Sequence, residues 1–97
     1  MEVQALLFPH MTNEQVIETC KHYKKEFFPK SEYCANIHSE KRTTEDVLSH
    51  CGYMCDKIIA GDLNEHIEKT MRWLGFIQGC LWSTGLCSID DMKDNNR

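Results

Sequence analysis

Apolar residues recur at helical spacing in three successive segments of the chain. In the first segment they are separated by four, three and four residues, which places them on one face of a helix. These residues are Val16, Cys20, Tyr23 and Phe27. Thr12 and Gln15 form a capping-box pattern ahead of them, and Pro29 follows them. The pattern predicts a helix from Asn13 to Phe28.

The second segment begins at Thr43 and Thr44, which are good N-cap residues, and continues to Gly61, a natural C-terminal stop. Its apolar face consists of Val47, Leu48, Cys51, Met54, Cys55, Ile58 and Ile59. Gly52 inside such a helix costs about 1 kcal/mol relative to alanine, so we expect a close neighbour there. Residues 30–42 have no sustained period and are expected to form a loop.

The third segment, from Asp62 to Cys87, is the one on which we expect the others to pack. Asp62 and Glu65 resemble a cap and its box partner, and no Asp, Glu, Lys or Arg occurs between Trp73 and Ile89. Two apolar stripes run along it: Leu63, Ile67, Met71 and Leu74, and then Trp73, Phe76, Ile77 and Cys80. A helix that is apolar on most sides is expected to be enclosed on most sides.

The predicted fold is therefore all-α: a small bundle of about four helices in a single domain, residues 1–97. Residues 1–11 are a candidate N-terminal arm, and Ser88 with Asp91 predicts a last short helix. The short joint between the second and third helices predicts a central antiparallel helical hairpin. So small a chain has few residues left to cover the third helix, and we expect a homo-oligomer to cover it.

Composition narrows the classes of partner. Apolar residues at 41% and charged residues at 27% are typical of a soluble globular protein, and the net charge of −4 disfavours nonspecific nucleic-acid binding. The uncharged stretch before Ile89 is too short and too polar to span a bilayer, so no membrane partner is expected. Six cysteines without a signal-peptide pattern predict reduced thiols and a cytoplasmic location.

One line of the third helix is a candidate functional face. Helical spacing aligns Glu68, Arg72, Gly75, Gly79 and Trp82, and the two glycines would leave a shallow groove. In one interpretation another helix fills the groove, Arg72 pairs with Glu68, and Trp82 belongs to the core. Truncating a core Trp82 to alanine would then cost ~3–5 kcal/mol. In the other, Arg72 binds an anion and Trp82 stacks on a ring of the same ligand.

Three further polar residues are candidates for partner or ligand contacts. Gln78 lies among apolar residues, so its amide either binds backbone across a subunit boundary, which we favour, or recognises a ligand. Lys24 and Lys25 belong to a basic group with Lys21 and Lys30 that could attract a phosphate or an acidic protein. Because acidic residues are interleaved with them, a solvated face is the simpler interpretation.

Metal binding and catalysis are less favoured. Cys34, His38, Cys51 and Cys55 could supply four zinc ligands, but no Cys-x-x-Cys knuckle is present and two of them fit an apolar face. His50 beside Cys51 is a poor activating base, since adjacent helical residues point about 100° apart. No metal, cofactor or catalytic activity is predicted.

The second half of the chain resembles a family of small, mostly uncharacterised proteins of tailed bacteriophages and prophages. The likeness is carried by HCGYMCDKI (residues 50–58) and KTMRWLGFIQGCLWSTGLCSIDDMKDNNR (residues 69–97). The matching positions are His50, Met54, Cys55, Arg72, Trp73, Leu74, Gly75, Phe76, Gln78, Gly79, Gly85, Ile89, Asn96 and Arg97. The resemblance implies an accessory protein in the host cytoplasm that binds and inhibits a host protein, such as a component of antiviral defence. The alternatives are an oligomeric sponge for a small anionic nucleotide and a zinc-stabilised structural module.

Overall fold

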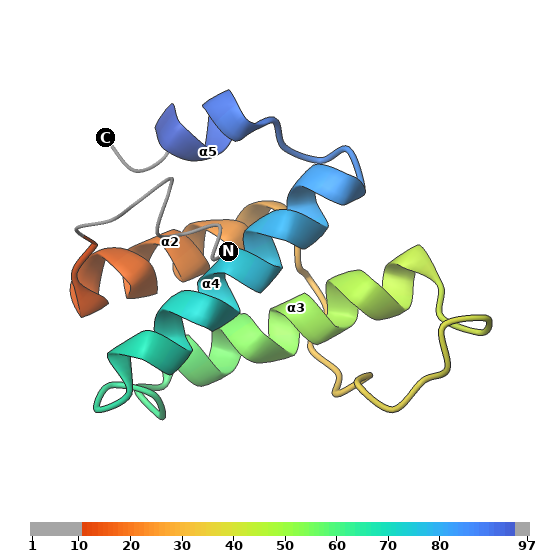
Figure 1. The fold of residues 1–97 in the computed structure, drawn as a ribbon, viewed down its shortest axis with the longest axis horizontal. Coiled ribbons are helices and arrows are strands. Elements are labelled where there is room, and N and C mark those ends of the chain that lie inside the picture. Colours follow the sequence, from red (N-terminus) through yellow and green to blue (C-terminus); the bar gives the residue numbers. More distant parts are fainter. Residues whose placement is uncertain (1–10, 95–97) are drawn as a thin grey trace.

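A computed structural model describes residues 11–94, and all of their regular structure is helical. The helices are α2 (Asn13–Glu26), α3 (Thr44–Ile59), α4 (Ile67–Ser83) and α5 (Ile89–Asp94), shown in Figure 1. The all-α prediction is thus confirmed for this part of the chain. The predicted N-terminal arm lies outside the described residues apart from Met11, as do Asn96 and Arg97.

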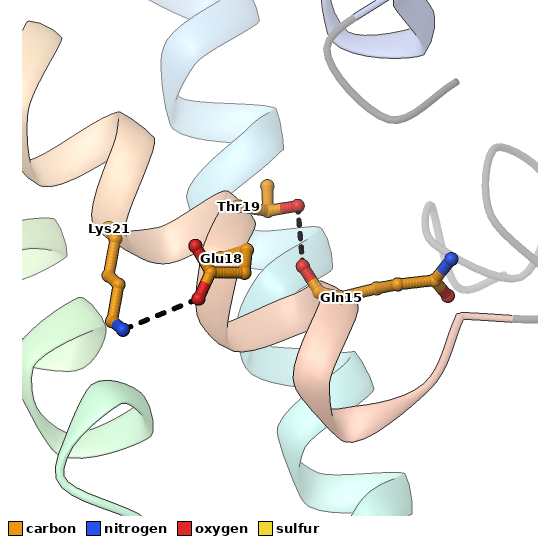
Figure 2. Close-up of polar contacts among 4 residues, drawn as sticks. All are labelled: Gln15, Glu18, Thr19 and Lys21. Atoms are coloured by element: carbon orange, nitrogen blue, oxygen red, sulfur yellow. Dashed lines mark hydrogen bonds and ion pairs between the residues drawn. The ribbon is translucent and has the colours of Figure 1, made fainter.

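Helix α2 begins where the capping box predicts. The Thr12 hydroxyl accepts a hydrogen bond from the Gln15 amide, and the Gln15 side chain accepts one from the Thr12 amide. One turn further, Thr19 Oγ1 donates to the Gln15 carbonyl at 2.8 Å, and Lys21 pairs with Glu18 at 3.3 Å (Figure 2). The helix ends at Glu26, before the predicted Phe28, because the Tyr23 carbonyl takes the amides of both phenylalanines that follow.

Helix α3 confirms both the second cap and the predicted close neighbour of its glycine. Thr43 forms a capping box with Asp46. Gly52 is buried, and a Cβ built there would overlap the Lys30 carbonyl oxygen and lie 3.3 Å from Cβ of Phe28. The chain after α2 therefore crosses α3 at the one position where a side chain is missing.

Helix α4 begins four residues later than predicted, so Asp62 and Glu65 are not its cap and box partner. Its N-cap is His66, which makes no side-chain capping bond. Residues 60–65 form turns, and Gly61 has a φ of 85° within them. These turns bury Leu63, which is only 7% exposed. Thr70 Oγ1 donates to the Leu63 carbonyl at 3.0 Å and fixes that turn.

The three long helices contact one another around one core (Figure 1). Fully or almost fully buried residues come from every described helix: Val16, Cys20, Tyr23, Cys51, Met54, Cys55, Ile58, Leu74, Ile77, Leu81 and Met92. Residues 60–66 connect α3 to α4, and the antiparallel hairpin remains a prediction. Helix α5 begins as predicted, since Ser88 and Asp91 exchange hydrogen bonds at 3.0 Å.

The expected enclosure of the end of α4 is not found within the described chain. Phe76 is 52% exposed and Trp82 is 61% exposed, whereas Leu81 beside Trp82 is fully buried. Helix α4 is therefore apolar on its outer face as well as toward the core. Homo-oligomerisation, which would cover this face, remains a prediction. Across residues 11–94, no helix combines the length and apolar character needed to cross a membrane.

Candidate functional site

A pocket of about 510 Å³ opens between residues 34–42, α3 and α4, and we call it the α3–α4 pocket. Its lining is Cys34, Ala35, Arg42, Asp46, Val47, His50, Phe76, Cys80 and Ser83. Only the α3 and α4 residues come from predicted helices, and the rest come from a stretch predicted as loop. Tertiary packing creates this site, since its residues span 50 positions of sequence.

The loop wall of the pocket is held against α3 by hydrogen bonds that its backbone amides donate. The Glu32 amide donates to the Ser49 carbonyl at 3.1 Å, and the Cys34 amide donates to Nδ1 of His50 at 3.1 Å. Gly52 permits the close crossing that brings these groups together. The absence of a side chain at one helix position thus sets the position of a whole pocket wall.

His50 is held as a neutral ring. Because Nδ1 accepts the Cys34 amide, the proton of the neutral imidazole is on Nε2. Burial lowers the pKa of His50, and the nearby Arg42 charge lowers it further. The Arg42 guanidinium is itself engaged, because Nε and Nη2 donate to the Ile37 carbonyl at 3.2 and 2.8 Å. Each of these side chains therefore makes a hydrogen bond within the chain, and His50 presents no positive charge to the pocket.

Four rings form a partly exposed aromatic cluster beside the pocket: Tyr33, His50, Tyr53 and Phe76. Tyr33 meets His50 and Tyr53 edge-on at centroid distances of 5.4 and 5.2 Å, and His50 stacks on Tyr53 at 5.7 Å. Phe76 meets His50 edge-on at 6.5 Å. These distances lie in the favourable range for ring pairs, so the cluster presents a packed aromatic surface.

Two pairs of thiols differ in their access to solvent. Cys20 and Cys55 are both fully buried, and interaction with Cys20, together with burial, raises the pKa of Cys55. Interaction with Cys80, together with burial, raises the pKa of Cys51, whereas interaction with Cys51 lowers the pKa of Cys80. Cys51 is fully buried, but Cys80 is half-buried and lines the α3–α4 pocket.

The predicted face of α4 is open, and the first interpretation of it is wrong for the described chain. Arg72 is exposed and makes no ion pair with Glu68 or with any other residue in 11–94. A Cβ at Gly79 would have no atom of the described residues within 4 Å, so no helix within residues 11–94 fills the groove there. Trp82 is exposed and is not part of the core. Gly75, in contrast, is buried.

Gln78 is fully buried, and within residues 11–94 its side chain makes one hydrogen bond, to a side chain of α2. Nε2 donates to the Tyr23 hydroxyl oxygen at 3.3 Å, while Oε1 has no partner in the described residues. The favoured role of this amide, a backbone contact across a subunit boundary, remains a prediction. Burial raises the pKa of Tyr23 to about 12, even though the hydrogen bond from Gln78 acts to lower that pKa.

The lysines of the basic group are interleaved with acids, as the solvated-face interpretation requires. Lys24 pairs with Asp56 at 3.3 Å, and Lys30 pairs with Glu45. Lys25 is exposed. None of these lysines lines the α3–α4 pocket.

The candidate zinc ligands are dispersed. In residues 11–94 no three histidine, cysteine or acidic side chains are grouped so that they could hold a metal ion. Cys55 is fully buried in the core, whereas the His38 side chain is 83% exposed. The Asp46 carboxylate accepts the Thr43 amide as a cap.

The sequence indicated neither the aromatic cluster nor the place of Cys80 in the pocket lining. Tyr33 lies in an aperiodic loop, and Phe76 and Cys80 belong to a stripe that was expected to be enclosed. The apolar surplus on α4 was the one available signal, and it did not distinguish a pocket wall from a subunit interface. No family model, curated protein or solved structure matches this chain.

Proposed function

We propose that this chain is a non-enzymatic binding protein that uses the rim of the α3–α4 pocket to hold another protein. The observation that carries the proposal is the exposure of Tyr33 and Phe76, at 60% and 52%, within a packed aromatic cluster. Aromatic side chains are enriched in protein interfaces and often dominate their binding energy. Rings that are already packed lose little conformational freedom when a partner covers them.

The polar groups of the pocket favour an apolar ligand group. Arg42 bonds the Ile37 carbonyl, His50 accepts the Cys34 amide, and Asp46 caps α3. Each of these polar groups makes a hydrogen bond inside the chain. Val47 and Phe76 give the pocket an apolar wall, which an apolar or aromatic side chain of a partner can contact.

The resemblance to phage proteins suggests the class of partner. A host protein, such as a defence component, would be held stoichiometrically and blocked. A second copy of the chain is the competing occupant, because the apolar face of α4 continues from Phe76 toward Trp82.

A matched pair of substitutions tests the proposal. Phe76→Ser removes the ring at the pocket, and Ile67→Ser removes a 44%-exposed apolar side chain at the other end of α4. We expect a partner captured from host extract by the unmodified chain to be retained by Ile67→Ser and lost by Phe76→Ser. Circular dichroism checks that both variants fold. Equal retention by both variants would place the binding surface elsewhere.

Sedimentation of the purified chain at micromolar concentration separates the two occupants. An 11.3 kDa particle that captures the host protein supports the heterologous complex. A dimer that Phe76→Ser dissociates assigns the surface to a second copy instead.

Binding of a small anionic nucleotide on the outer face of α4 is the second candidate function. It is favoured by the unpaired Arg72, the exposed Trp82 and the open groove at Gly79. Quenching of tryptophan fluorescence by a panel of cyclic and linear nucleotides would test it. Arg72→Gln should abolish the quenching, and Lys25→Gln, on α2, should leave it unchanged. Saturable quenching that persists in Arg72→Gln would contradict the assignment.

A further inference from the structure

The loop wall of the α3–α4 pocket, residues 34–42, is joined to a helix by a single hydrogen bond among the described residues. This is the bond from the Cys34 amide to Nδ1 of His50, on α3, at 3.1 Å. In the part of the chain that the structure describes, the other hydrogen bonds of this segment stay within it. They run from its own amides and from the Arg42 side chain to carbonyls of residues 34–39. The attachment of the segment to α3 therefore depends on one ring nitrogen.

Nδ1 of His50 can accept this hydrogen bond only while the ring is neutral. A backbone amide is always a donor, so the ring nitrogen that faces the Cys34 amide carries no hydrogen. In the protonated imidazole both nitrogens carry hydrogen, and no rotation of the ring restores an acceptor. Cys34 is buried, so water replaces the ring poorly as a partner of this amide.

Charged and titratable groups face His50 from three elements. They are Tyr33, Cys34 and Arg42 on the loop side, Asp46 and Tyr53 on α3, and Cys80 on α4. Burial and then the Arg42 charge lower the pKa of His50, so both act against protonation of the ring. Asp46, the acidic residue of the described lining, accepts the Thr43 amide at 2.9 Å.

We propose that His50 is a pH-sensitive switch of the α3–α4 pocket, and that protonation of its ring releases residues 34–42 from α3 and opens the loop wall. The inference goes beyond the proposed function, because it concerns the free chain and holds whether or not a partner occupies the rim.

The loop wall is expected to loosen as the solution becomes acidic. With the segment bound, the pKa of His50 is below its ordinary value of 6.5, so the closed form binds fewer protons at His50 than the released form. The hydrogen bond therefore contributes fully above pH 6.5. Its contribution is lost as the pH falls through the lower pKa of the closed form.

Release of the segment would also rearrange the aromatic cluster. Tyr33 precedes Cys34 and meets His50 and Tyr53 edge-on at centroid distances of 5.4 and 5.2 Å. A movement of Cys34 therefore shifts the Tyr33 ring on the rim of the pocket. One residue earlier, the Glu32 amide donates to the Ser49 carbonyl, a bond between backbone groups that do not titrate. The movement is expected to begin after Glu32.

The test is amide hydrogen exchange of the full-length, ¹⁵N-labelled chain at pH 7.5 and pH 5.0. Each rate is divided by the rate expected for the unfolded chain at the same pH. We expect the protection of the Cys34 amide to fall by about tenfold at the lower pH, while the Glu32 amide keeps its protection. The ring ¹⁵N signals should show Nδ1 of His50 without hydrogen at pH 7.5. Unchanged protection of Cys34, an equal fall at Glu32 or a protonated Nδ1 at pH 7.5 would overturn the proposal.

Two variants assign the change to one histidine. His50→Asn offers an amide oxygen in place of Nδ1, an acceptor that does not titrate, so the Cys34 amide should stay protected at pH 5.0. His38→Asn, at an exposed side chain of the same segment, should behave as the unmodified chain does. The same acid-induced fall in His50→Asn would contradict the assignment. Should that variant fail to fold, the comparison of Cys34 with Glu32 in the unmodified chain, followed against the titration of the His50 ring, decides.

Discussion

Gly52 and Gly79 lie inside neighbouring helices but in opposite surroundings. At Gly52 the backbone of Lys30 crosses α3 so closely that a Cβ would overlap its carbonyl oxygen, whereas at Gly79 a Cβ would meet no atom within 4 Å. The first glycine belongs to a closed region, in which the chain after α2 packs on α3 and builds the wall of the α3–α4 pocket. The second belongs to an open region, the outer face of α4. The same residue type therefore serves packing in one helix and leaves a surface uncovered in the next.

The largest effect is expected where α4 faces the core. Leu81 is fully buried, so Leu81→Ala should lower the free energy of unfolding by about 2–5 kcal/mol, through lost burial and the cavity left behind. Leu86, which is 42% exposed, is the matched control, and Leu86→Ala should change stability by about 0.5 kcal/mol or less. Urea denaturation measures both, and equal losses would show that the two leucines are covered alike.

High pH should destabilise the closed region through Tyr23. Its folded-state pKa of about 12 is above the ordinary value of 10.0, so the folded chain keeps the phenol proton that the unfolded chain releases. The resulting contribution to the free energy of unfolding is fully present below pH 10. It is lost as pH rises toward 12, and the total loss is roughly 2–3 kcal/mol.

Comparison with Tyr23→Phe isolates that contribution. The lysines and cysteines also titrate at high pH, but they are the same in both chains. We expect the melting temperature of the unmodified chain to fall more steeply between pH 10 and 12 than that of the variant. Parallel curves would mean that the phenol titrates normally in the folded chain.

Alanine at the two glycines should have effects of opposite sign. Gly52→Ala should destabilise by about 1–3 kcal/mol, since the obstructing atoms are backbone and cannot rotate away. Gly79→Ala should stabilise by roughly 0.5–1 kcal/mol, because alanine favours the helix and has room. Thermal melts of the two variants decide between these outcomes. A loss of stability in Gly79→Ala would indicate that another molecule fills the groove.

The smallest effect is expected on the open face. Trp82 is 61% exposed, so Trp82→Ala should change stability by about 0.5 kcal/mol or less, in place of the ~3–5 kcal/mol expected for a core ring. The measurement is best made at low and high protein concentration. A loss of several kcal/mol that appears only at high concentration would show that a second copy covers the ring.

Local signals in the sequence were sufficient where neighbouring residues complete the structure themselves. The caps at Thr12, Thr43 and Ser88 each form with a partner three residues away, so their hydrogen bonds need no tertiary contact. The start of α4 was predicted wrongly at Asp62 by the same logic. There, Leu63 is buried, and Thr70 Oγ1 donates hydrogen bonds to the carbonyls of Leu63 and His66. These tertiary and local contacts hold the chain in turns in spite of the capping pattern.

What the sequence by itself determined is the all-α class, the approximate limits of α2, α3 and α5, and a surplus of apolar side chains on α4. These follow from periodicity and capping, which act within a few residues. Only the tertiary structure decided which apolar residues face outward and which distant residues meet. Tyr33 and Cys34 reach His50, Phe76 and Cys80 because a loop crosses α3 at Gly52, and no periodicity encodes that crossing. Helical spacing fixes the faces of a helix, but what covers each face depends on the rest of the chain.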